Sequence, residues 1–483
     1  MREIVHNIVV GRDETDFQKF NERGTGIIGK HFVGEKKEAH LTNPVRMDFL
    51  RPHIAGIFGK RGTGKSFTLG VLAEEMALLE DDVRKNLSCI IIDAMGIFWS
   101  MKNPNDRDMS LFLSWNIKPQ RFPINLVIPR GQIKSFVENE IPFDAVFSLN
   151  PAELSAEDWS LTFRLDPDSD MGVLLQKALK RAKKAGEDFT LEDLALQVRN
   201  EKAEEHVKDA LINRLAIASG WGIFEESFRN QEQDKKPASN EELLERDLAY
   251  LKPQKHGPPI PESSEKAHSL FSPEESQKKQ DYIRYSSLLD FIVPGKITVV
   301  DLSLLGDWSV RSLVVGLLSK KVLEARMESR RIEEMEAVEG VANPSKTPMT
   351  WIMIDEAHQF LPAKGETPAT APLLQCVKIG REPGVSLVFV TQQPNKLHEA
   401  AISQCDLIIS HRLTSKQDIN ALGNIMQTYL KYDLQEYIDA LPRLKGAAII
   451  LDDNSERIYA VRIRPRMSWH AGGSPSAIKD TKV

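Results

Sequence analysis

The residues with the clearest chemical meaning stand between positions 59 and 66, in the segment Gly59-Lys60-Arg61-Gly62-Thr63-Gly64-Lys65-Ser66. This segment fits the P-loop pattern, in which glycines let backbone N–H groups turn toward phosphate oxygens. An apolar run, IAGIF, precedes it and a helical pattern, SFTLGVLAEEM, follows it, so the positive end of a helix would add to the phosphate-binding field. We expect ATP to bind at residues 59–66 and the adjoining Phe67, with Lys65 at the β- and γ-phosphates and the Ser66 hydroxyl on Mg²⁺.

Two adjacent carboxylates, Asp355 and Glu356, follow the apolar run 351–354. Sites of open α/β sheets form at the carboxyl ends of buried strands, where such side chains would meet a bound phosphate. Asp355 is therefore the predicted Mg²⁺ ligand, and Glu356 is the predicted group that orients and polarises the attacking water. Together with the P-loop, this pair predicts hydrolysis of ATP and not binding alone.

A further apolar run, 385–390, ends in polar side chains. In P-loop motors, the strand beside the acidic strand often ends in a residue that senses the γ-phosphate. Gln392 is the first candidate for this role and Thr391 is the second. The alternative interpretation, that both are ordinary loop residues, stays open.

Arg381 stands at a predicted helix end, in the glycine-rich turn Ile379-Gly-Arg-Glu-Pro-Gly. An arginine at such a place is suited to stabilise transition-state charge on the γ-phosphate of a neighbouring chain. It is equally suited to complement the helix dipole as a C-terminal cation. The local residues alone favour neither role.

Length and composition exclude several classes of protein. The chain has 483 residues, which at about 100–200 residues per domain suggests two to four structural units. Hydrophobic residues make up 41%, charged residues 27%, and the net charge is −6, as in an ordinary globular protein. Three widely spaced cysteines form neither a disulfide framework nor a zinc cluster. Since no apolar run is long enough for a membrane span or a signal peptide, we expect a cytoplasmic protein without membrane contact.

Short apolar runs alternate with helical patterns along the chain, which predicts an α/β fold. Continuous apolar runs are typical of strands buried on both faces in a mainly parallel sheet. Helical periodicity begins at residue 67 and again at residue 310, where a long amphipathic pattern runs toward a charged stretch near residue 330. The predicted strands are residues 54–58, 89–92, 297–300, 351–354, 387–390, 407–409 and 447–451.

We divide the chain into two parts of one core and the segments around them. Residues 151–290 are a mostly helical insertion, in which Thr190 is a predicted N-cap and residues 228–280 have the composition of a charged, flexible linker. The core is predicted at residues 50–150 and 291–465. A short N-terminal segment, 1–49, precedes it and a C-terminal tail, 466–483, of the kind that is usually frayed, follows it.

Several segments together resemble the HerA branch of the HerA/FtsK superfamily of P-loop, hexameric DNA translocases. The resemblance covers residues 50–100 and 295–465, and its segments occur in the order of that family. One departure is that HerA proteins usually carry an N-terminal β-barrel, for which residues 1–49 are short, so a barrel here is reduced or absent. The matching segments are RPHIAGIFGKRGTGKSFTLGVLAEEM, IIIDAMG, ITVVDLSLL, WIMIDEAHQF and VKIGREPGVSLVFVTQQPNKLHEAAISQCDLIISHRL.

This resemblance implies a RecA-like core that assembles as a homohexamer, with ATP at subunit interfaces and movement along double-stranded DNA. It implies Gln392 as the sensor and Arg381 as the finger that acts across a subunit boundary. It agrees with phosphate, metal and hydrolysis roles for Lys65, Ser66, Asp355 and Glu356. Asp93 stands where the family often has an acidic residue, with its role open. A partner nuclease similar to NurA, or an effector of an anti-phage system, is a further expectation.

Other functions compete with this interpretation. The residues Asp355-Glu-Ala-His358 spell the box of a DEAH helicase, but 290 residues separate Lys65 from Asp355, and too few follow for a second motor domain. His358 is therefore expected to be a local helix-start residue. No LSGGQ-like signature supports a transporter ATPase. A ring-forming ATPase that scaffolds or regulates an effector, with little translocation, is the main alternative, and a protein-remodelling ATPase is a weaker one.

Residues 101–136 mix cationic and aromatic side chains and are candidate DNA contacts in the pore of a ring. Phosphate contacts from such cations would make binding strongly salt-dependent. The alternative is a solvated loop with a few packed aromatics. The residues concerned are Lys102, Arg107, Lys118, Arg121, Arg130 and Lys134, with Phe112, Trp115 and Phe122.

Overall fold

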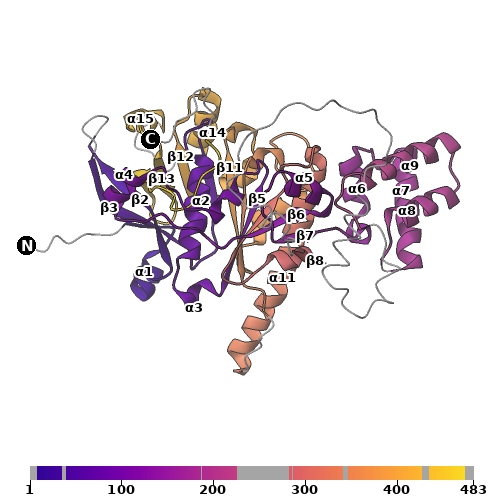
Figure 1. Cartoon of the computed structure of the whole chain (residues 1–483), viewed down its shortest axis with the longest axis horizontal. Coiled ribbons are helices and arrows are strands. Elements are labelled where there is room, and N and C mark those ends of the chain that lie inside the picture. The colour runs from indigo at the N-terminus through magenta and orange to yellow at the C-terminus, as the bar shows by residue number, and fades with distance from the viewer. Residues whose placement is uncertain are drawn as a thin grey trace, which may run out of the picture.

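The architecture is a single large β-sheet with helices on both faces (Figure 1). A computed structural model describes residues 8–34, 40–186, 188–225, 282–285, 287–340, 346–426 and 434–473. Within these residues the sheet has 14 strands in the order β1-β3-β2-β14-β13-β12-β4-β11-β10-β5-β9-β6-β7-β8. The strands from β12 to β8 in this order pair in parallel. The pairs β12–β13, β13–β14, β14–β2 and β2–β3 are antiparallel. The predicted α/β class with a mainly parallel sheet is confirmed.

The strands are β1 (Ile8–Val10), β2 (Thr25–Val33), β3 (His40–Asp48), β4 (Ile54–Phe58), β5 (Leu87–Asp93), β6 (Asn125–Pro129), β7 (Ala145–Phe147), β8 (Ile283–Tyr285), β9 (Ile297–Asp301), β10 (Met349–Ile354), β11 (Val385–Thr391), β12 (Leu407–His411), β13 (Ala447–Asp452) and β14 (Arg457–Ile463). The α-helices are α1 (Glu14–Phe20), α2 (Lys65–Ala77), α3 (Asp81–Arg84), α4 (Met109–Trp115), α5 (Ile133–Glu138), α6 (Ala156–Phe163), α7 (Asp170–Ala185), α8 (Leu191–Asn200), α9 (Glu205–Ser219), α11 (Trp308–Glu339), α12 (Thr370–Ile379), α13 (Glu399–Ser403), α14 (Lys416–Met426) and α15 (Leu434–Ala440).

Each of the seven predicted apolar runs is a strand, corresponding to β4, β5 and β9 to β13. All seven are buried along nearly their whole length, as a strand covered on both faces must be. The parallel orientation expected for them is wrong for β13, which pairs antiparallel to β12. An apolar run reports burial on both faces and not direction, so the orientation of β13 was not encoded in its composition.

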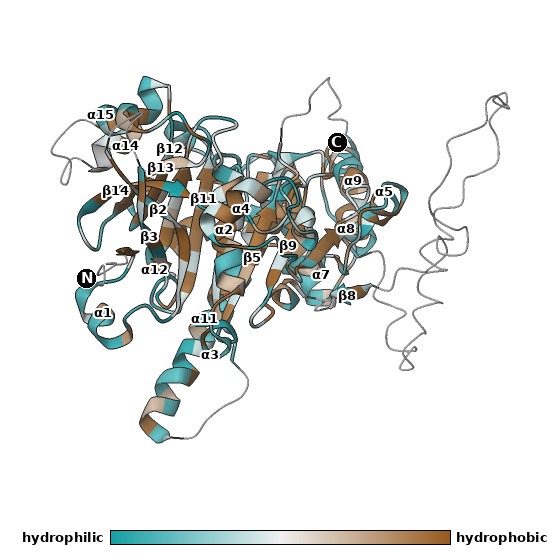
Figure 2. Ribbon diagram, turned by 60° about the vertical axis from the view of Figure 1, so that its left-hand side comes forward, coloured by the Kyte–Doolittle hydropathy of each residue, from teal (hydrophilic) through white to brown (hydrophobic). Residues whose placement is uncertain are grey.

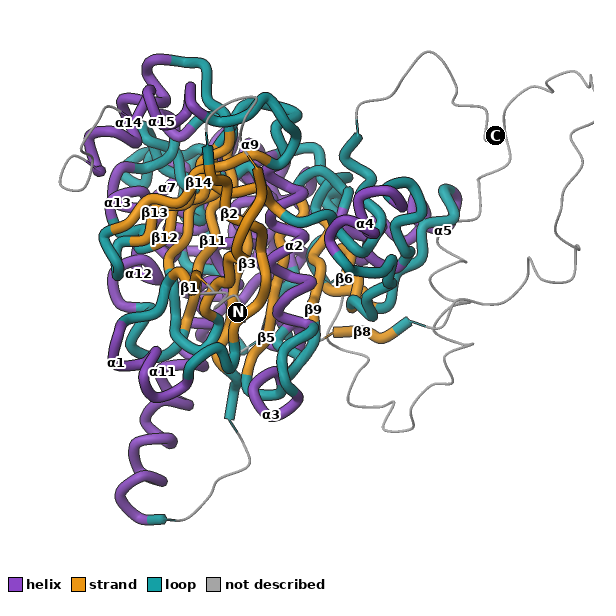
Figure 3. Tube along the Cα trace, turned by 90° about the vertical axis from the view of Figure 1, so that its left-hand side faces the viewer, coloured by secondary structure: helices purple, strands orange, loops and turns teal. Residues whose placement is uncertain are grey.

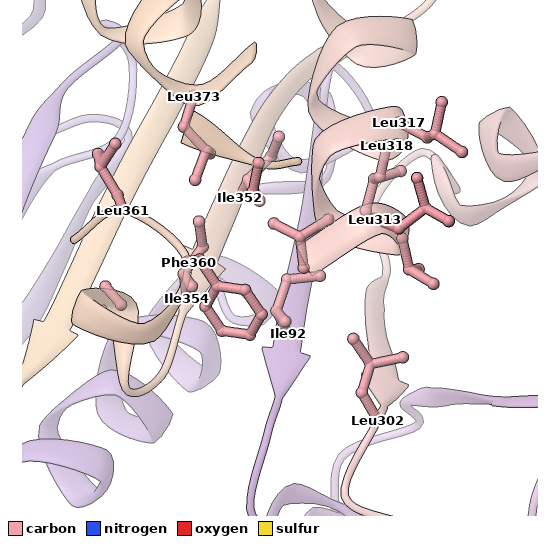
Figure 4. Close-up of a cluster of buried hydrophobic side chains, with 14 of the residues drawn as sticks. Ile92, Leu302, Leu313, Leu317, Leu318, Ile352, Ile354, Phe360, Leu361 and Leu373 are labelled. Atoms are coloured by element: carbon pink, nitrogen blue, oxygen red, sulfur yellow. The ribbon is translucent and has the colours of Figure 1, made fainter. Parts of the chain in front are cut away.

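Two hydrophobic cores fill the two faces of the sheet. Alternate residues of one strand enter different cores: Ile90 and Ile92 join the first, Cys89 and Ile91 the second. In the first, Ile92 packs with strand β10 and with Leu313 of α11 (Figure 4). Central strands are accordingly hydrophobic and outer helix faces hydrophilic in Figure 2. Each fully buried aliphatic side chain stabilises the fold by roughly 1.5–3 kcal/mol.

Helices cover both faces of the sheet. Figure 3 shows α2 on one side of the strands and α12 and α13 on the other. The second half of α11 continues away from the sheet (Figure 1). Helices α6 to α9 form a compact group beside the sheet, where a mostly helical insertion was predicted. Thr190 caps α8 as predicted, since its side chain and that of Asp193 accept each other's backbone N–H groups. The predicted linker 228–280 lies outside the described residues.

The N-terminal segment belongs to the same sheet. Strand β2 pairs with β14, β3 pairs with β2, and β1 pairs in parallel with β3. These strands were not identified from the sequence, because their residues are only partly buried and polar residues interrupt the apolar pattern.

Arg464, Arg466 and Ser468 are buried, in contrast to the frayed tail expected after residue 465. Arg464 donates from Nε to Glu75 Oε1 at 2.6 Å and from Nη1 to Glu74 Oε2 at 2.8 Å. Arg466 and Ser468 also contact Glu74 Oε1, at 3.4 and 2.6 Å. Burial disfavours ionised Glu74, but the charges of both arginines outweigh it and lower its pKa. These ion pairs fasten residues 464–468 to the helix that follows the P-loop.

We expect Glu74→Ala to lower the free energy of unfolding by about 3–5 kcal/mol, because it leaves the buried Arg466 without its counter-ion and the buried Arg464 with Glu75 alone. Urea unfolding followed by circular dichroism measures the change. Glu334→Ala, which removes an exposed ion pair with Arg330 on α11, is the control and should cost at most about 1 kcal/mol. Equal losses in the two variants would contradict a stabilising role for the buried cluster.

Candidate active site

The P-loop connects the end of β4 to the start of α2, as its position in the sequence predicts. Gly59 has φ 156°, and a Cβ there would lie 2.6 Å from His411 Cβ and 2.7 Å from Thr63 Oγ1. Gly64, the N-cap of α2, has φ 113°, in the left-handed region that favours glycine. Both positions need glycine, so the loop is shaped by the residues that define its pattern.

Lys65 is buried at the first position of α2. Its ammonium group lies 3.3 Å from the carbonyl oxygen of Lys60, on the inner side of the loop. Burial lowers the pKa of Lys65, and the charges of Glu356 and Asp355 oppose this shift. A cation that is enclosed and only partly compensated in this way is suited to bind phosphate oxygens.

Ser66 and Asp355 meet across the strand ends. The Ser66 hydroxyl donates to Asp355 Oδ2 at 2.9 Å, although β11 lies between β4 and β10 in the sheet. Burial raises the pKa of Asp355, while the Ser66 hydrogen bond and Lys65 oppose the rise. A hydroxyl and a carboxylate oxygen this close, at a phosphate-binding loop, are donors of the type that Mg²⁺ prefers. The two residues therefore fit the expected metal.

Glu356 has the features of a residue held for function. Its backbone has φ 50° and ψ 42°, a left-handed conformation that costs energy for a residue with a Cβ. Its Oε2 atom is buried and accepts no hydrogen bond within the described residues. Burial and the neighbouring charge of Asp355 raise the pKa of Glu356, whereas Lys65 and Arg61 lower it. Glu356 Oε2 lies 3.5 Å from His358 Nδ1, which is too long for a good hydrogen bond. This buried acceptor is therefore suited to receive a hydrogen bond from water.

Thr391 and His358 join the ends of β11 and β10. Thr391 Oγ1 lies 2.9 Å from His358 Nδ1 and accepts a hydrogen bond from the backbone N–H of Gln393 at 3.0 Å. Burial, with Lys396 and Lys65, lowers the pKa of His358 to about 4, so this imidazole is neutral. The Thr391 hydroxyl thus already has hydrogen-bond partners at the end of β11. The half-buried Gln392 has no side-chain hydrogen bond within the described residues. Gln392 stays the first candidate sensor.

Arg381 lies at the amino-terminal ends of the strands, opposite the ends that carry the P-loop and Asp355. It precedes the first residue of β11, while Gln392 follows the last. The strand has seven residues and spans roughly 20 Å at about 3.3 Å per residue. The Arg381 side chain is 44% exposed and donates from Nη2 to Gln404 O at 2.8 Å. Arg381 is therefore not part of its own chain's P-loop site.

A basic hollow adjoins the P-loop on the side of β12 and β13. It has a volume of about 210 Å³, and Gly62 and Thr63 of the P-loop form one wall. Three cations, Arg412, Arg443 and Lys445, line the rest together with apolar residues. With Lys60, Arg61 and Lys65 of the loop itself, these cations give this edge a positive field that suits a polyphosphate.

Asp93 and Asp301, at the ends of the neighbouring strands β5 and β9, accept hydrogen bonds from backbone N–H groups. Asp93 accepts hydrogen bonds from the backbone N–H groups of residues 95–98 at 2.7–3.1 Å and so shapes the loop after β5. Burial and the adjacent Asp301 raise the pKa of Asp93, against these hydrogen bonds. Sequence reasoning missed Asp301, although its place directly after the predicted strand 297–300 was a visible signal.

The candidate DNA contacts in residues 101–136 differ in burial and in their partners. The three aromatic side chains, Phe112, Trp115 and Phe122, are buried and form no surface for stacking with bases. Lys102 pairs with Asp144 at 2.6 Å, and Lys134 lies 3.7 Å from Glu138. Arg107 lies over the ring of Trp469. The packed aromatics match the alternative stated above, although the segment also contains α4, β6 and the start of α5 and is not one loop. Lys118 and Arg121 are exposed and Arg130 is half-buried.

Two family models match most of the chain. A model described as the central domain of helicase HerA matches residues 29–322, more than half of the chain. A model described as helicase HerA-like C-terminal matches residues 333–458. The chain belongs to the HerA family. The first match includes helices α6 to α9 and strands β3 to β9, so the helical insertion lies within the region that this family model covers.

This HerA-family chain is similar to proteins named DNA double-strand break repair helicase HerA. The one from Pyrococcus furiosus is 30% identical over 193 residues, 37% of this chain and 34% of the relative. The one from Sulfurisphaera tokodaii is 27% identical over 214 residues, 42% of this chain and 41% of the relative. The one from Sulfolobus acidocaldarius is 20% identical over 450 residues, 93% and 72% of the two chains. The chain thus spans less than half of the first two relatives.

Two solved structures have similar architectures. VirB4 of Thermoanaerobacter pseudethanolicus has a TM-score of 0.48 and 14% identity, with 91% of this chain and 96% of that chain covered. The bacterial conjugative coupling protein TrwB, in a monoclinic form, has a TM-score of 0.44 and 14% identity, with 88% of each chain covered. Among the described residues, no helix has both the length and the apolar character that crossing a membrane requires.

We expect Lys65→Ala to weaken ATP binding by at least about tenfold, because it removes a charge-assisted hydrogen bond to the phosphates. Titration with a fluorescent ATP analogue measures the dissociation constant. Lys85→Ala, which removes an exposed lysine next to α3, is the control and should bind as the unaltered chain does. An unchanged affinity of Lys65→Ala would remove Lys65 as a phosphate ligand.

Proposed function

We propose that this HerA-family chain is an ATPase that works as the motor of a homohexameric ring moving along double-stranded DNA. The observation that carries the proposal is the meeting of Ser66 with Asp355 at 2.9 Å, beside a buried Glu356 oxygen that has no hydrogen-bond partner within the described residues. These side chains are of the types that bind phosphate, Mg²⁺ and water, and their proximity at the carboxyl ends of parallel strands supports the proposal.

The residues divide the reaction between them. The backbone N–H groups of the P-loop and Lys65 bind the β- and γ-phosphates. Ser66 and Asp355 would hold Mg²⁺, which would supply positive charge next to the phosphate oxygens. Glu356 Oε2 accepts a hydrogen bond from the attacking water and aligns it with the γ-phosphorus. The bond from the γ-phosphorus to the bridging oxygen breaks as the bond to water forms, which gives ADP and phosphate. Gln392, between the P-loop strand and the acidic strand, contacts the γ-phosphate.

We expect Glu356→Gln to bind ATP with near-normal affinity but to hydrolyse it at least about a hundredfold more slowly, because an amide is a poor base and acceptor for the water proton. Steady-state release of phosphate measures the rate. Glu366→Gln, at an exposed carboxylate in the loop after β10, makes the same chemical change outside the site and should keep the normal rate. Near-normal turnover by Glu356→Gln would remove Glu356 as the water-orienting group.

The position of Arg381 supports the proposed ring. Because this partly exposed guanidinium lies about a strand length from its own P-loop, we propose that it completes the ATP site of a neighbouring chain. It would stabilise the charge that develops on the γ-phosphate in the transition state. Six such shared sites make the homohexamer. Double-stranded DNA is the proposed substrate of the ring, in keeping with the names of the relatives. A nuclease or other effector protein is the proposed partner.

We expect Arg381→Ala to fold and bind ATP but to hydrolyse it about a thousandfold more slowly, the lower range for loss of an arginine finger. Its chains, when mixed with Lys65→Ala chains, should recover activity, because a Lys65→Ala neighbour still supplies Arg381 to an intact P-loop. Phosphate release across mixing ratios measures the recovery. Absence of recovery in rings shown to co-assemble would contradict a finger that acts between chains.

The burial of Phe112, Trp115 and Phe122 favours a second candidate function. It removes the aromatic part of the predicted DNA contacts, so the same hydrolysis site would also suit a ring that regulates an effector with little translocation. The response of ATP hydrolysis to DNA separates the two functions.

A further inference from the structure

Arg381 is anchored by a carboxylate at its own edge of the sheet. Its Nη2 atom lies 3.7 Å from Asp406 Oδ1 and donates to the carbonyl oxygen of Gln404. Arg381 stands before β11, Asp406 stands directly before β12, and the strand between these two is β4. The anchor therefore lies where three neighbouring strands begin.

Asp406 is itself fixed on two further sides. Its Oδ1 accepts the backbone N–H of Ile54 at 2.9 Å, and its Oδ2 lies 2.7 Å from His53 Nδ1. Its side chain is only 6% exposed. Because backbone and imidazole together define the plane of the carboxylate, Asp406 has one orientation from which to hold a guanidinium group.

His53 links Asp406 to a second buried carboxylate. Its Nε2 atom lies 3.3 Å from Asp48 Oδ2, and Asp48 in turn pairs with Arg12. Burial by itself would lower the pKa of His53, but the hydrogen bonds to Asp406 and Asp48 outweigh it and raise the pKa to about 9. Both ring nitrogens face carboxylates, so both donate only when the imidazole is protonated. Charges thus alternate from Arg12 through Asp48, His53 and Asp406 to Arg381.

This arrangement has a physical consequence for Arg381. A long, partly exposed arginine samples many rotamers, and ordering it on a phosphate costs entropy. A fixed carboxylate and a fixed carbonyl reduce the rotamers before a neighbouring chain arrives, which lowers that cost. His53 also precedes β4, whose other end carries the P-loop, so one strand joins the anchor of the finger to the chain's own ATP site.

We propose that Asp406, held by His53, is a positioning residue that presets Arg381 for the γ-phosphate of the neighbouring chain. The inference rests on the proposed function, in which Arg381 completes that neighbour's site. Asp406 touches neither ATP nor the reacting atoms and acts only through Arg381. The competing interpretation is that Asp406 holds Arg381 back, in which case its loss would speed hydrolysis.

The test uses Asp406→Asn, which keeps an oxygen for the Ile54 N–H but removes the charge facing Arg381 and His53. We expect kcat to fall by about a hundredfold, as for a displaced catalytic group, with KM for ATP nearly unchanged. Asp453→Asn is the matched control, because it removes an exposed carboxylate from the loop after β13 at the same edge. It should keep the normal kcat. A normal or raised kcat in Asp406→Asn would overturn the proposal.

Two further measurements separate positioning from a merely structural role. Asp406→Asn chains mixed with Lys65→Ala chains should recover activity, because the neighbour then supplies a well-placed Arg381. The double variant Asp406→Asn, Arg381→Ala should be no slower than Arg381→Ala alone. Absence of recovery in co-assembled rings, or an additional loss in the double variant, would overturn the proposal. His53→Gln should give the same pattern and serves if Asp406→Asn does not fold.

Arg381→Ala, measured in parallel, distinguishes the failure of this inference from that of the proposed function. If Arg381→Ala is inactive while Asp406→Asn has normal kcat, only the positioning role is wrong. If Arg381→Ala keeps its normal rate, the proposed finger is wrong and the positioning role falls with it.

Discussion

The hydrogen bond from Ser66 Oγ to Asp355 Oδ2 joins residues 289 positions apart, and the functional site depends on it. It forms because β4, β11 and β10 are parallel neighbours, so their carboxyl ends meet at one edge of the sheet. The P-loop follows β4, Gln392 follows β11, and Asp355 with Glu356 follows β10. Any change in strand order or direction would separate these groups. The buried strands and both cores therefore serve to hold a site whose polar members are few.

Because these strands run in the same direction, their amino-terminal ends also lie together, and these ends have a different role. There the strands begin, and there His53, Asp406 and Arg381 lie together. A site at one end of each strand and a guanidinium at the other cannot meet within one chain, but they can meet between chains arranged in a ring. The direction of the strands thus links hydrolysis to assembly. The series of alternating charges from Arg12 through Asp48, His53 and Asp406 to Arg381 fixes the side chains at the amino-terminal ends of the strands.

Much of this site was predictable from the sequence, because its signals are local. The glycines of the P-loop and the pair Asp355-Glu356 are contiguous, and continuous apolar runs mark the strands before them. The missed features depend on partners that are distant in the sequence. Arg464 and Arg466 resemble a basic surface until Glu74 and Glu75 are placed beside them. Asp406 and His53 are 353 positions apart, so neither residue signals its pairing. The aromatics of residues 101–136 show the reverse error, since spacing alone does not distinguish a stacking surface from a packed interior.

The measurement that tests the central claim most directly is steady-state ATP hydrolysis with and without linear double-stranded DNA, across a series of salt concentrations. Glu356→Gln provides the blank for contaminating activity. The account predicts that DNA stimulates hydrolysis several-fold and that the stimulation fades as salt rises, because the release of counter-ions from the DNA backbone gains less free energy in a more concentrated salt solution, which weakens DNA binding. Clear hydrolysis that ignores DNA at every salt concentration would contradict a DNA-coupled motor and would favour a ring that regulates an effector protein.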